Sequence, residues 1–249
     1  RFETMDEFHV VRFQQMAKNA MEQIYANGHI PIVVGGTGFY IQALLYDIDF
    51  TSTAQDDTYR AELENLVKEK GAAYLHNMLR KVDPKSAEDI HANNVKRVIR
   101  ALEYYRQTGQ KMSEHNEEER RKESPYEFVY FVLNAPREQL YARIDRRVDQ
   151  MIEEGLVDEV KHLKELGCTK EMVSMQGLGY KEILAYLDGE CDLDTAVYTI
   201  KRDTRHFAKR QLTWFRRERQ VTWIQKEVYD YDEDRILKAM LSHLEGRIC

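Results

Sequence analysis

Residues 30–45, Ile-Pro-Ile-Val-Val-Gly-Gly-Thr-Gly-Phe-Tyr-Ile-Gln-Ala-Leu-Leu, are the stretch that indicates the fold. Their first five residues are apolar, which predicts a short buried strand at 30–34. The glycine-rich turn 35–38 follows at once, and a helix is predicted at 39–45. A buried strand, a glycine turn and a helix in this order are typical of a parallel α/β sheet. Such sheets bind ligands beyond the carboxyl ends of their strands, where this turn lies.

The turn lets a phosphate or a base approach the backbone closely, because glycine has no Cβ atom. It is not a P-loop, since that motif requires Gly-x-x-x-x-Gly-Lys-Ser/Thr and the chain contains no Gly-Lys dipeptide. An ordinary strand-to-helix turn is the alternative interpretation.

Further elements of the same domain are predicted before and after this stretch. Apolar residues at helical spacing predict a helix that ends at Asn27-Gly28. Two apolar and aromatic runs predict two more strands. The predicted ranges are 8–26 for the helix, 126–133 and 221–224 for the strands, and 232–244 for a closing helix.

From residue 51 to residue 124 the sequence is charged and rich in helix-forming residues, with no convincing buried strand. Its predicted helices are 56–70, 72–81, 84–91 and 94–108, and 114–122 is predicted to be a charged connector. The economical interpretation is a helical block inserted between two strands of one sheet. The predicted domains are therefore an α/β core, residues 1–50 and 125–249, and a helical insertion, residues 51–124.

Composition is typical of a globular protein: of 249 residues, 43% are hydrophobic and 32% are charged. Cys168, Cys191 and Cys249 form neither a disulfide framework nor a Cys-x-x-Cys metal site, which favours a reducing compartment. The apolar runs are far shorter than the roughly 20 residues that cross a bilayer. With no signal-peptide pattern either, we expect a cytoplasmic protein without a membrane partner.

The most basic part of the chain is residues 200–219. It carries eight Lys and Arg against two acids, although the whole chain has a net charge of −6. Such a concentration predicts a surface for a polyanion, and a solvated amphipathic helix is the alternative. Helical spacing predicts one stripe that faces a core, formed by Val197, Ile200, Phe207, Gln211 and Trp214. A second stripe is predicted to remain in water, formed by Arg202, Arg205, Lys209 and Arg216.

Two more segments have residues suited to nucleic acid. Lys96, Arg97 and Arg100 form a basic patch on the helix predicted at 94–108, for which a solvated face is the alternative. The other face of that helix carries Val95, Val98, Ile99, Leu102 and Tyr105. Residues 176–181 form a glycine-interrupted loop with an aromatic ring and a cation, which suits single-stranded nucleic acid or a plain helix N-terminus. The eight histidines lack the spacing of metal ligands, so no metal site is predicted.

Arg143 and Arg147 lie one helical turn apart, a spacing suited to holding a phosphate group between two guanidinium groups. Asp145 and Asp149 offer the alternative, because ion pairs within the same helix would absorb these charges. The sequence leaves both interpretations open.

Four motifs resemble those of the tRNA dimethylallyltransferase family and occur in that family's order. They are Gly-Gly-Thr-Gly-Phe-Tyr at 35–40, Ile-His-Ala-Asn-Asn-Val-Lys-Arg-Val-Ile-Arg-Ala-Leu-Glu at 90–103, Gln-Gly-Leu-Gly-Tyr-Lys-Glu at 176–182 and Ala-Lys-Arg-Gln-Leu-Thr-Trp-Phe-Arg at 208–216. The resemblance covers essentially the whole chain, and the last motif is highly specific.

The resemblance implies transfer of a dimethylallyl group from dimethylallyl diphosphate to N6 of the adenosine next to the anticodon of a tRNA. It implies a P-loop-NTPase-like parallel sheet with an inserted all-helical domain that grips the anticodon stem-loop. The family flips the target base into a channel that the diphosphate enters from the other side. Mg²⁺ is expected with the diphosphate, and the protein is expected to be a monomer.

Matching the motifs residue by residue implies where the substrates bind. Thr37 is expected to contact the tRNA at the channel and to take part in catalysis, and Arg60 to contact tRNA from the insertion. Arg143, from its spacing and a looser part of the match, is expected to hold the diphosphate. The remaining implied tRNA surface comprises Lys96, Arg97, Val98, Ile99, Arg100, Gln176, Gly177, Leu178, Gly179, Tyr180, Lys181, Lys209, Arg210, Gln211, Leu212, Thr213, Trp214, Phe215 and Arg216.

The family also carries an N-terminal P-loop and, soon after it, an Asp that serves as general base, and neither lies in these residues. Because nothing else in the sequence looks degenerate, we expect both upstream of Arg1. A non-catalytic tRNA-binding protein is the alternative if nothing precedes Arg1. An adenine-nucleotide prenyltransferase is a second alternative, which the separate basic patches disfavour because a free nucleotide needs only one small pocket.

Overall fold

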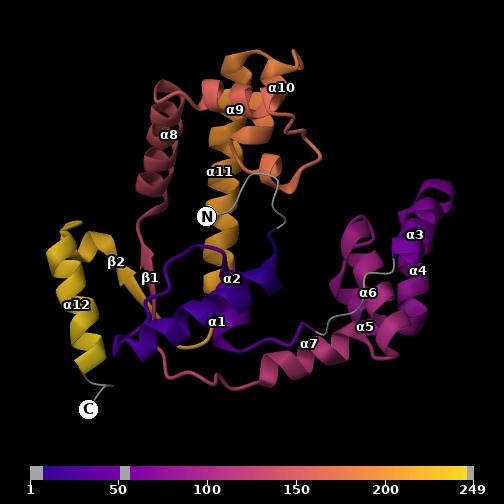
Figure 1. Ribbon diagram of the computed structural model, residues 1–249, viewed down its shortest axis with the longest axis horizontal. Coiled ribbons are helices and arrows are strands. Elements are labelled where there is room, and N and C mark those ends of the chain that lie inside the picture. Colours follow the sequence, from indigo (N-terminus) through magenta and orange to yellow (C-terminus); the bar gives the residue numbers. More distant parts are fainter. Residues whose placement is uncertain (1–7, 51–56, 246–249) are drawn as a thin grey trace. The chain divides into compact units, whose positions relative to one another are not determined.

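The computed structural model describes residues 8–50 and 57–245, which are mostly helical with a small parallel sheet (Figure 1). The chain divides into two compact units. We call Arg1–Ile41 with Glu127–Cys249 the sheet unit, and Gln42–Tyr126 the helical unit. Among the described residues, no helix combines the length and the apolar character needed to cross a bilayer.

The sheet unit contains the two paired strands, β1 (Tyr130–Asn134) and β2 (Val221–Gln225), which run parallel. Their register places Tyr130 opposite Val221 and Asn134 opposite Gln225, whose side-chain amides are hydrogen-bonded at 2.9 Å. The parallel arrangement of these predicted strands is confirmed. β1 begins at Tyr130, later than the predicted residue 126.

The helices of the sheet unit lie before, between and after these strands. They are α1 (Val10–Ala26), the start of α2 (Gly38–Leu45), α8 (Arg137–Glu153), α9 (Leu156–Glu165), α10 (Tyr180–Leu187), α11 (Leu193–Phe215) and α12 (Glu233–Glu245), with short 3₁₀ turns η1 (Val173–Gln176) and η2 (Lys226–Tyr229). Figure 1 shows the long α11 running from α9 and α10 toward the start of α2. The main core of the unit lies between α8, α9, α10 and α11, around Val160, Met175, Ile183 and Ile200.

The predicted buried strand at 30–34 is wrong. The segment has no regular structure, and Ile32 and Val34 are 84% and 90% exposed. A strand needs a neighbour for its backbone N–H and C=O groups. Among the described residues only β1 and β2 pair with each other, so this segment has no neighbour. The glycine turn and the helix after it form as predicted.

The helical unit contains α3 (Asp57–Lys70), α4 (Ala72–Val82), α5 (Pro84–Asp89), α6 (Val95–Thr108) and α7 (Met112–Arg121). The first four lie close to their predicted bounds. Apolar side chains from these four helices form the core of the unit, which includes Leu63, Leu75, Leu79, Ala87, Val98 and Leu102.

The prediction of a connector at 114–122 is wrong, because nearly all of this segment lies in α7. Its acidic and basic residues favour a helix, since they form ion pairs one turn apart, such as Lys111 with Glu114 and Arg121 with Glu117. A contact with a distant carboxylate, that of Asp83, also holds the first turn of α7.

Asp83 is a fully buried carboxylate that joins α5 to α7. It accepts hydrogen bonds from the backbone N–H and the hydroxyl of Ser86, at 3.0 and 2.6 Å, and from the same two groups of Ser113, at 3.0 and 2.6 Å. Burial alone would raise the pKa of Asp83, but these hydrogen bonds outweigh it and hold the pKa below its usual value. The carboxylate therefore remains ionised inside the helical unit.

We predict that Asp83→Asn lowers the free energy of unfolding by about 1–3 kcal/mol at neutral pH, because an amide cannot accept four hydrogen bonds. The pKa of Asp83 is lower in the folded than in the unfolded protein. The contribution of Asp83 to the free energy of unfolding is therefore complete above the unfolded-state pKa of about 4. It is lost as the pH falls through the lower pKa of the folded state. Urea unfolding at several pH values measures both effects. The exposed Asp89→Asn is the control, and equal effects of the two variants would contradict the prediction.

Candidate functional site

The glycine turn of the first motif packs directly on α11, which carries the fourth motif. The Nε2 atom of Gln211 donates a hydrogen bond to the carbonyl oxygen of Gly36, at 2.7 Å. The Trp214 ring lies against Gly38 so closely that a Cβ atom there would be 2.1 Å from Cδ1 of the indole. Phe39 adds an edge-on contact with the same ring, with centroids 6.2 Å apart. Thr37, between the two glycines, is exposed.

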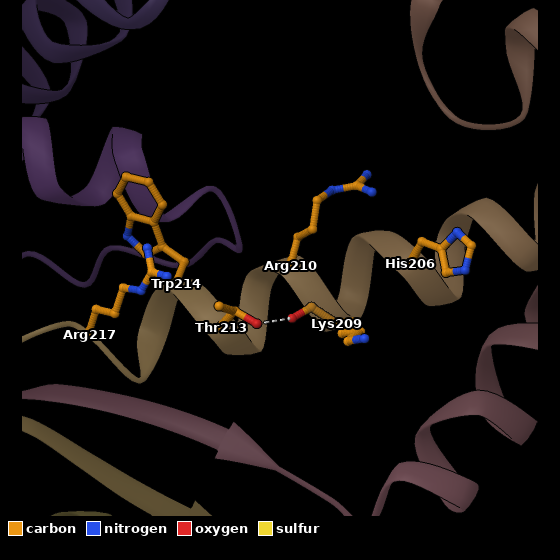
Figure 2. Close-up of a pocket in the computed structure, with 6 residues that line it drawn as sticks. All are labelled: His206, Lys209, Arg210, Thr213, Trp214 and Arg217. Carbon is orange, nitrogen blue, oxygen red and sulfur yellow. Dashed lines mark hydrogen bonds between the residues drawn. The ribbon is translucent and has the colours of Figure 1, made fainter. Parts of the chain in front are cut away.

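A basic concavity of about 400 Å³ lies along α11 beside this contact. It is lined by His206, Lys209, Arg210, Thr213, Trp214 and Arg217. The five that lie within α11 recur at three- and four-residue steps and share one face of the helix, and Arg217 follows in the turn just after it. Figure 2 shows the Trp214 ring pointing toward the ribbon of α2, with Arg217 beside it. One wall of the concavity is therefore also the surface that supports the glycine turn.

Two cations in the first half of the basic segment 200–219 form ion pairs with acids of α8. Lys201 pairs with Asp149 and Arg205 with Asp145, each at 2.5 Å. The expectation that Arg205 remains in water is wrong, because its side chain is only 24% exposed and bound to an acid across the helix interface. Arg202 pairs with its neighbour Asp203.

The cations in the second half of the basic segment, from Lys209 onward, are not paired with acids of the described residues. Within the described part of the chain, no carboxylate lies within ion-pair distance of Lys209, Arg210, Arg216, Arg217 or Arg219. The guanidinium group of Arg210 lies over the ring of Phe207, at 5.7 Å. Phe207 itself is 39% exposed, so the prediction that it faces a core is wrong. Positive charge is thus concentrated around the concavity.

The same ion pairs bear on the two interpretations of Arg143 and Arg147, which are binding of a phosphate and ion pairing within α8. Asp145 and Asp149 bind cations of α11, so they do not absorb Arg143 or Arg147 in local ion pairs. Both arginines are exposed, and neither has an acidic partner among the residues that the structure describes. The local ion-pair alternative is therefore not supported, and the two guanidinium groups remain available to an anion.

A family model described as IPP transferase matches residues 2–218. The chain belongs to the IPP transferase family. It is 59% identical over 243 residues to a tRNA dimethylallyltransferase of Lachnoclostridium phytofermentans, which covers 98% of this chain and 77% of that protein. The resemblance inferred from the four motifs is confirmed.

Two solved structures of this family are similar to the chain. The full-length tRNA isopentenylpyrophosphate transferase from Bacillus halodurans is 40% identical, with a TM-score of 0.62 over 97% of this chain and 78% of that one. A eukaryotic dimethylallyltransferase acting on tRNA is 30% identical, with a TM-score of 0.79 over 96% of this chain and 62% of that one.

The second family motif divides between the surface and the core. Lys96, Arg97 and Arg100 are exposed on α6. Val98 and Ile99 are 0% and 4% exposed, so their side chains lie in the core of the helical unit and not on its surface. The periodicity of the helix had placed them on its apolar face, and burial follows that periodicity. Of residues 96–100, the three cations are the ones whose side chains face solvent.

Arg60 lies on α3, where Nε and Nη2 donate to the two carboxylate oxygens of Glu103 at 2.8 and 2.6 Å. Its side chain is 42% exposed, and that of Glu103 is 9% exposed. The pair thus joins α3 to α6, a structural role that the sequence does not indicate because the partners are 43 positions apart.

The third motif forms the entry to α10. Gly179 has φ +101°, which an L side chain rarely adopts, and its N–H donates to the buried carboxylate of Glu182 at 2.9 Å. The Tyr180 hydroxyl is bound to Glu159, and this bond raises the pKa of Tyr180 to about 12. Its ring packs against the core of the sheet unit. Gln176 and Gly177 are exposed, whereas Leu178 and Lys181 are half-buried.

The fourth motif is also divided. Lys209, Arg210, Thr213 and Arg216 are exposed, Leu212 is half-buried, and Phe215 is 8% exposed and packs edge-on against Tyr130. Sequence reasoning missed His206 and Arg217 in the lining of the concavity. Their spacing from Arg210, four residues before and seven after, is the signal that would have found them.

Proposed function

We propose that this chain is a tRNA dimethylallyltransferase, which transfers a dimethylallyl group from dimethylallyl diphosphate to N6 of the adenosine adjacent to the anticodon. The observation that carries the proposal is the contact of the glycine turn with α11, because it joins two family motifs beside a basic concavity. A relative that is 59% identical bears this activity in its name, and the eukaryotic neighbour acts on tRNA.

The proposed reaction forms a bond between N6 of the adenine and C1 of the dimethylallyl group, and breaks the bond from C1 to the diphosphate oxygen. The diphosphate leaves with the bonding electron pair, and a general base accepts the proton that N6 loses. Negative charge develops on the diphosphate oxygens, so a cation placed there stabilises the transition state more than the ground state. Arg143 and Arg147 of α8 are the cations that we propose for this role.

The proposed tRNA surface consists of exposed cations in both units. Lys209, Arg210 and Arg216 in the sheet unit and Lys96, Arg97 and Arg100 in the helical unit have no acidic partner among the described residues. Such cations bind phosphates and release counterions. Two separate groups of them favour an RNA over a free adenine nucleotide. Thr37 is proposed to contact the tRNA where the target base enters.

We also propose that the fold is a P-loop-type parallel core with the helical unit as an inserted tRNA-binding domain. The exposed apolar segment at 30–34 supports this, because Ile32 and Val34 are typical of a strand buried in a parallel sheet. The interruption of the sheet unit by Gln42–Tyr126 supports the insertion.

Mg²⁺ is proposed to accompany the diphosphate. The residues described here contain no cluster of three His, Cys, Asp or Glu side chains that suits a cation. Mg²⁺ is usually bound by one or two carboxylates together with substrate phosphates, so we propose that the diphosphate oxygens would supply ligands to the ion. The protein is proposed to act as a monomer.

A transfer assay with the full-length protein tests the activity. We expect an anticodon stem-loop incubated with dimethylallyl diphosphate to gain the mass of one dimethylallyl group, and a stem-loop with guanosine at the target position to gain none. Modification of AMP instead would favour the nucleotide prenyltransferase. Tight stem-loop binding without transfer would favour the non-catalytic RNA-binding protein.

We predict that Arg210→Ala weakens anticodon stem-loop binding and that Arg205→Ala does not. Arg205 is paired with Asp145, whereas Arg210 has no acidic partner among the residues that the structure describes. Loss of one phosphate contact should reduce the slope of log affinity against log salt by about 1. If the wild type neutralises six phosphates, its slope is roughly −4 to −5. Fluorescence anisotropy at several salt concentrations measures both quantities.

The Arg205→Ala variant serves as the matched control on the same helix. It should lower the thermal midpoint slightly, because the ion pair with Asp145 contributes about 1 kcal/mol or less. Equal losses of RNA affinity in the two variants, or a wild-type salt slope near zero, would reject the charge distribution proposed for α11.

We predict that Arg143→Ala lowers the turnover of the full-length enzyme by about 30- to 1000-fold, the cost of losing a charge-assisted contact of ~2–4 kcal/mol in the transition state. The affinity for tRNA should remain nearly unchanged. Arg146→Ala, an exposed change on the same helix, is the control. Turnover at the wild-type rate in a folded Arg143→Ala protein would show that this guanidinium plays no part in the chemistry.

A further inference from the structure

The glycine turn is held by α11 at two points. At the first, the Gln211 side chain reaches the backbone and donates to the Gly36 carbonyl at 2.7 Å. At the second, the Trp214 indole fills the space where Gly38 would have a side chain. Gln211 and Trp214 are three residues apart on one face of the helix. The helix α11 thus fixes both ends of residues 36–38, the part of the glycine turn that contains Thr37.

Thr37 is the residue between these two points. Its carbonyl oxygen accepts hydrogen bonds from the N–H groups of Tyr40 and Ile41, at 2.9 and 3.2 Å, so it starts α2. Its neighbour Gly38 is buried, whereas Thr37 is exposed. The backbone of Thr37 is therefore held by α2 on one side and by α11 on the other, while the residue itself is exposed.

We propose that Gln211 is a positioning residue, which holds the turn so that the Thr37 hydroxyl meets the RNA substrate in a fixed place. The inference rests on the proposed function, because it assumes that Thr37 contacts the tRNA. The role requires a side chain that is long enough to reach the turn and that ends in a donor, since a carbonyl oxygen only accepts. Glutamate has the same length but no donor when ionised, and methionine has neither donor nor charge.

A purely structural role is the alternative, in which the hydrogen bond contributes to stability alone. The two roles predict different measurements. A structural contact changes the thermal midpoint and leaves the turnover of the folded protein intact. A positioning contact changes turnover with little effect on substrate affinity, because a displacement of about 1 Å near the chemistry costs up to roughly 100-fold in rate.

The first test compares Gln211→Met and Gln211→Glu with the wild type in the full-length enzyme. We expect kcat to fall about tenfold or more in both, with a smaller change in KM for the stem-loop and in the thermal midpoint. Gln150→Met is the matched control, because Gln150 is exposed and its side-chain amide donates to Glu154, the residue just after its own helix. Wild-type kcat in both Gln211 variants would overturn the inference.

The second test uses Gly36→Ala. A Cβ atom there would lie 2.4 Å from Nε2 of Gln211, the mobile end of that side chain, and the backbone of Gly36 is not in the left-handed region. The amide must therefore move away and lose its bond to the turn. If both changes act through this one bond, Gly36→Ala with Gln211→Met should be no slower than either single variant. If the fold-losses in kcat of the two single variants multiply in the double variant, the two changes act independently, and the inference is overturned.

Hydrogen exchange separates a failure of this inference from a failure of the proposed function. Loss of the Gln211 contact should speed exchange of the amides at 38–41 in the Gln211→Met protein, whether or not the wild type transfers a dimethylallyl group. Unchanged exchange there would overturn the positioning role. A wild type that does not modify the stem-loop, with faster exchange in the variant, would reject the proposed function and retain the contact as the one that fixes the turn.

Discussion

Close approach between the 36–38 turn and α11 depends on the absence of a Cβ atom at two positions. Any side chain at Gly38 would collide with the indole of Trp214, and one at Gly36 would displace the amide of Gln211. This constraint explains why glycines flank Thr37 on both sides. It also brings residues that are 175 positions apart into hydrogen-bonding distance. The site on the sheet unit is built around this contact.

Electrostatic pairing between α8 and α11 decides which part of the basic segment is available to a polyanion. Asp145 and Asp149 neutralise Arg205 and Lys201, and thereby leave the charge around Arg210 without a counterpart among the described residues. Because these two acids pair with α11, they do not form ion pairs with Arg143 and Arg147 on their own helix. One set of ion pairs therefore accounts both for the basic concavity on α11 and for the two exposed arginines on α8.

The family motifs contain two kinds of residue, and burial separates them. Val98 and Ile99 belong to the core of the helical unit, whereas Lys96, Arg97 and Arg100 of the same motif face solvent. Tyr180 and Glu182 of another motif shape the start of α10 through bonds to Glu159 and Gly179. A motif thus contains residues that the fold requires together with residues that face solvent, and only the second kind have side chains available to a substrate.

Most of the helices, the parallel pair of strands and the basic segment at 200–219 follow from the sequence alone, because local periodicity and composition determine them. The exception among the helices is α7, which the sequence analysis took for a connector. The family also follows from the sequence, since its motifs are continuous in the chain. Only the tertiary structure decided three other features. They are the lack of a strand at 30–34, the ion pair of Arg205 with Asp145 and the contact of Gln211 with Gly36. Each of these depends on partners distant in the chain, and neither periodicity nor spacing contains that information. An apolar run becomes a strand only where a neighbouring strand pairs with its backbone N–H and C=O groups. The charge of a cation is available to a ligand only where no carboxylate of the protein pairs with it.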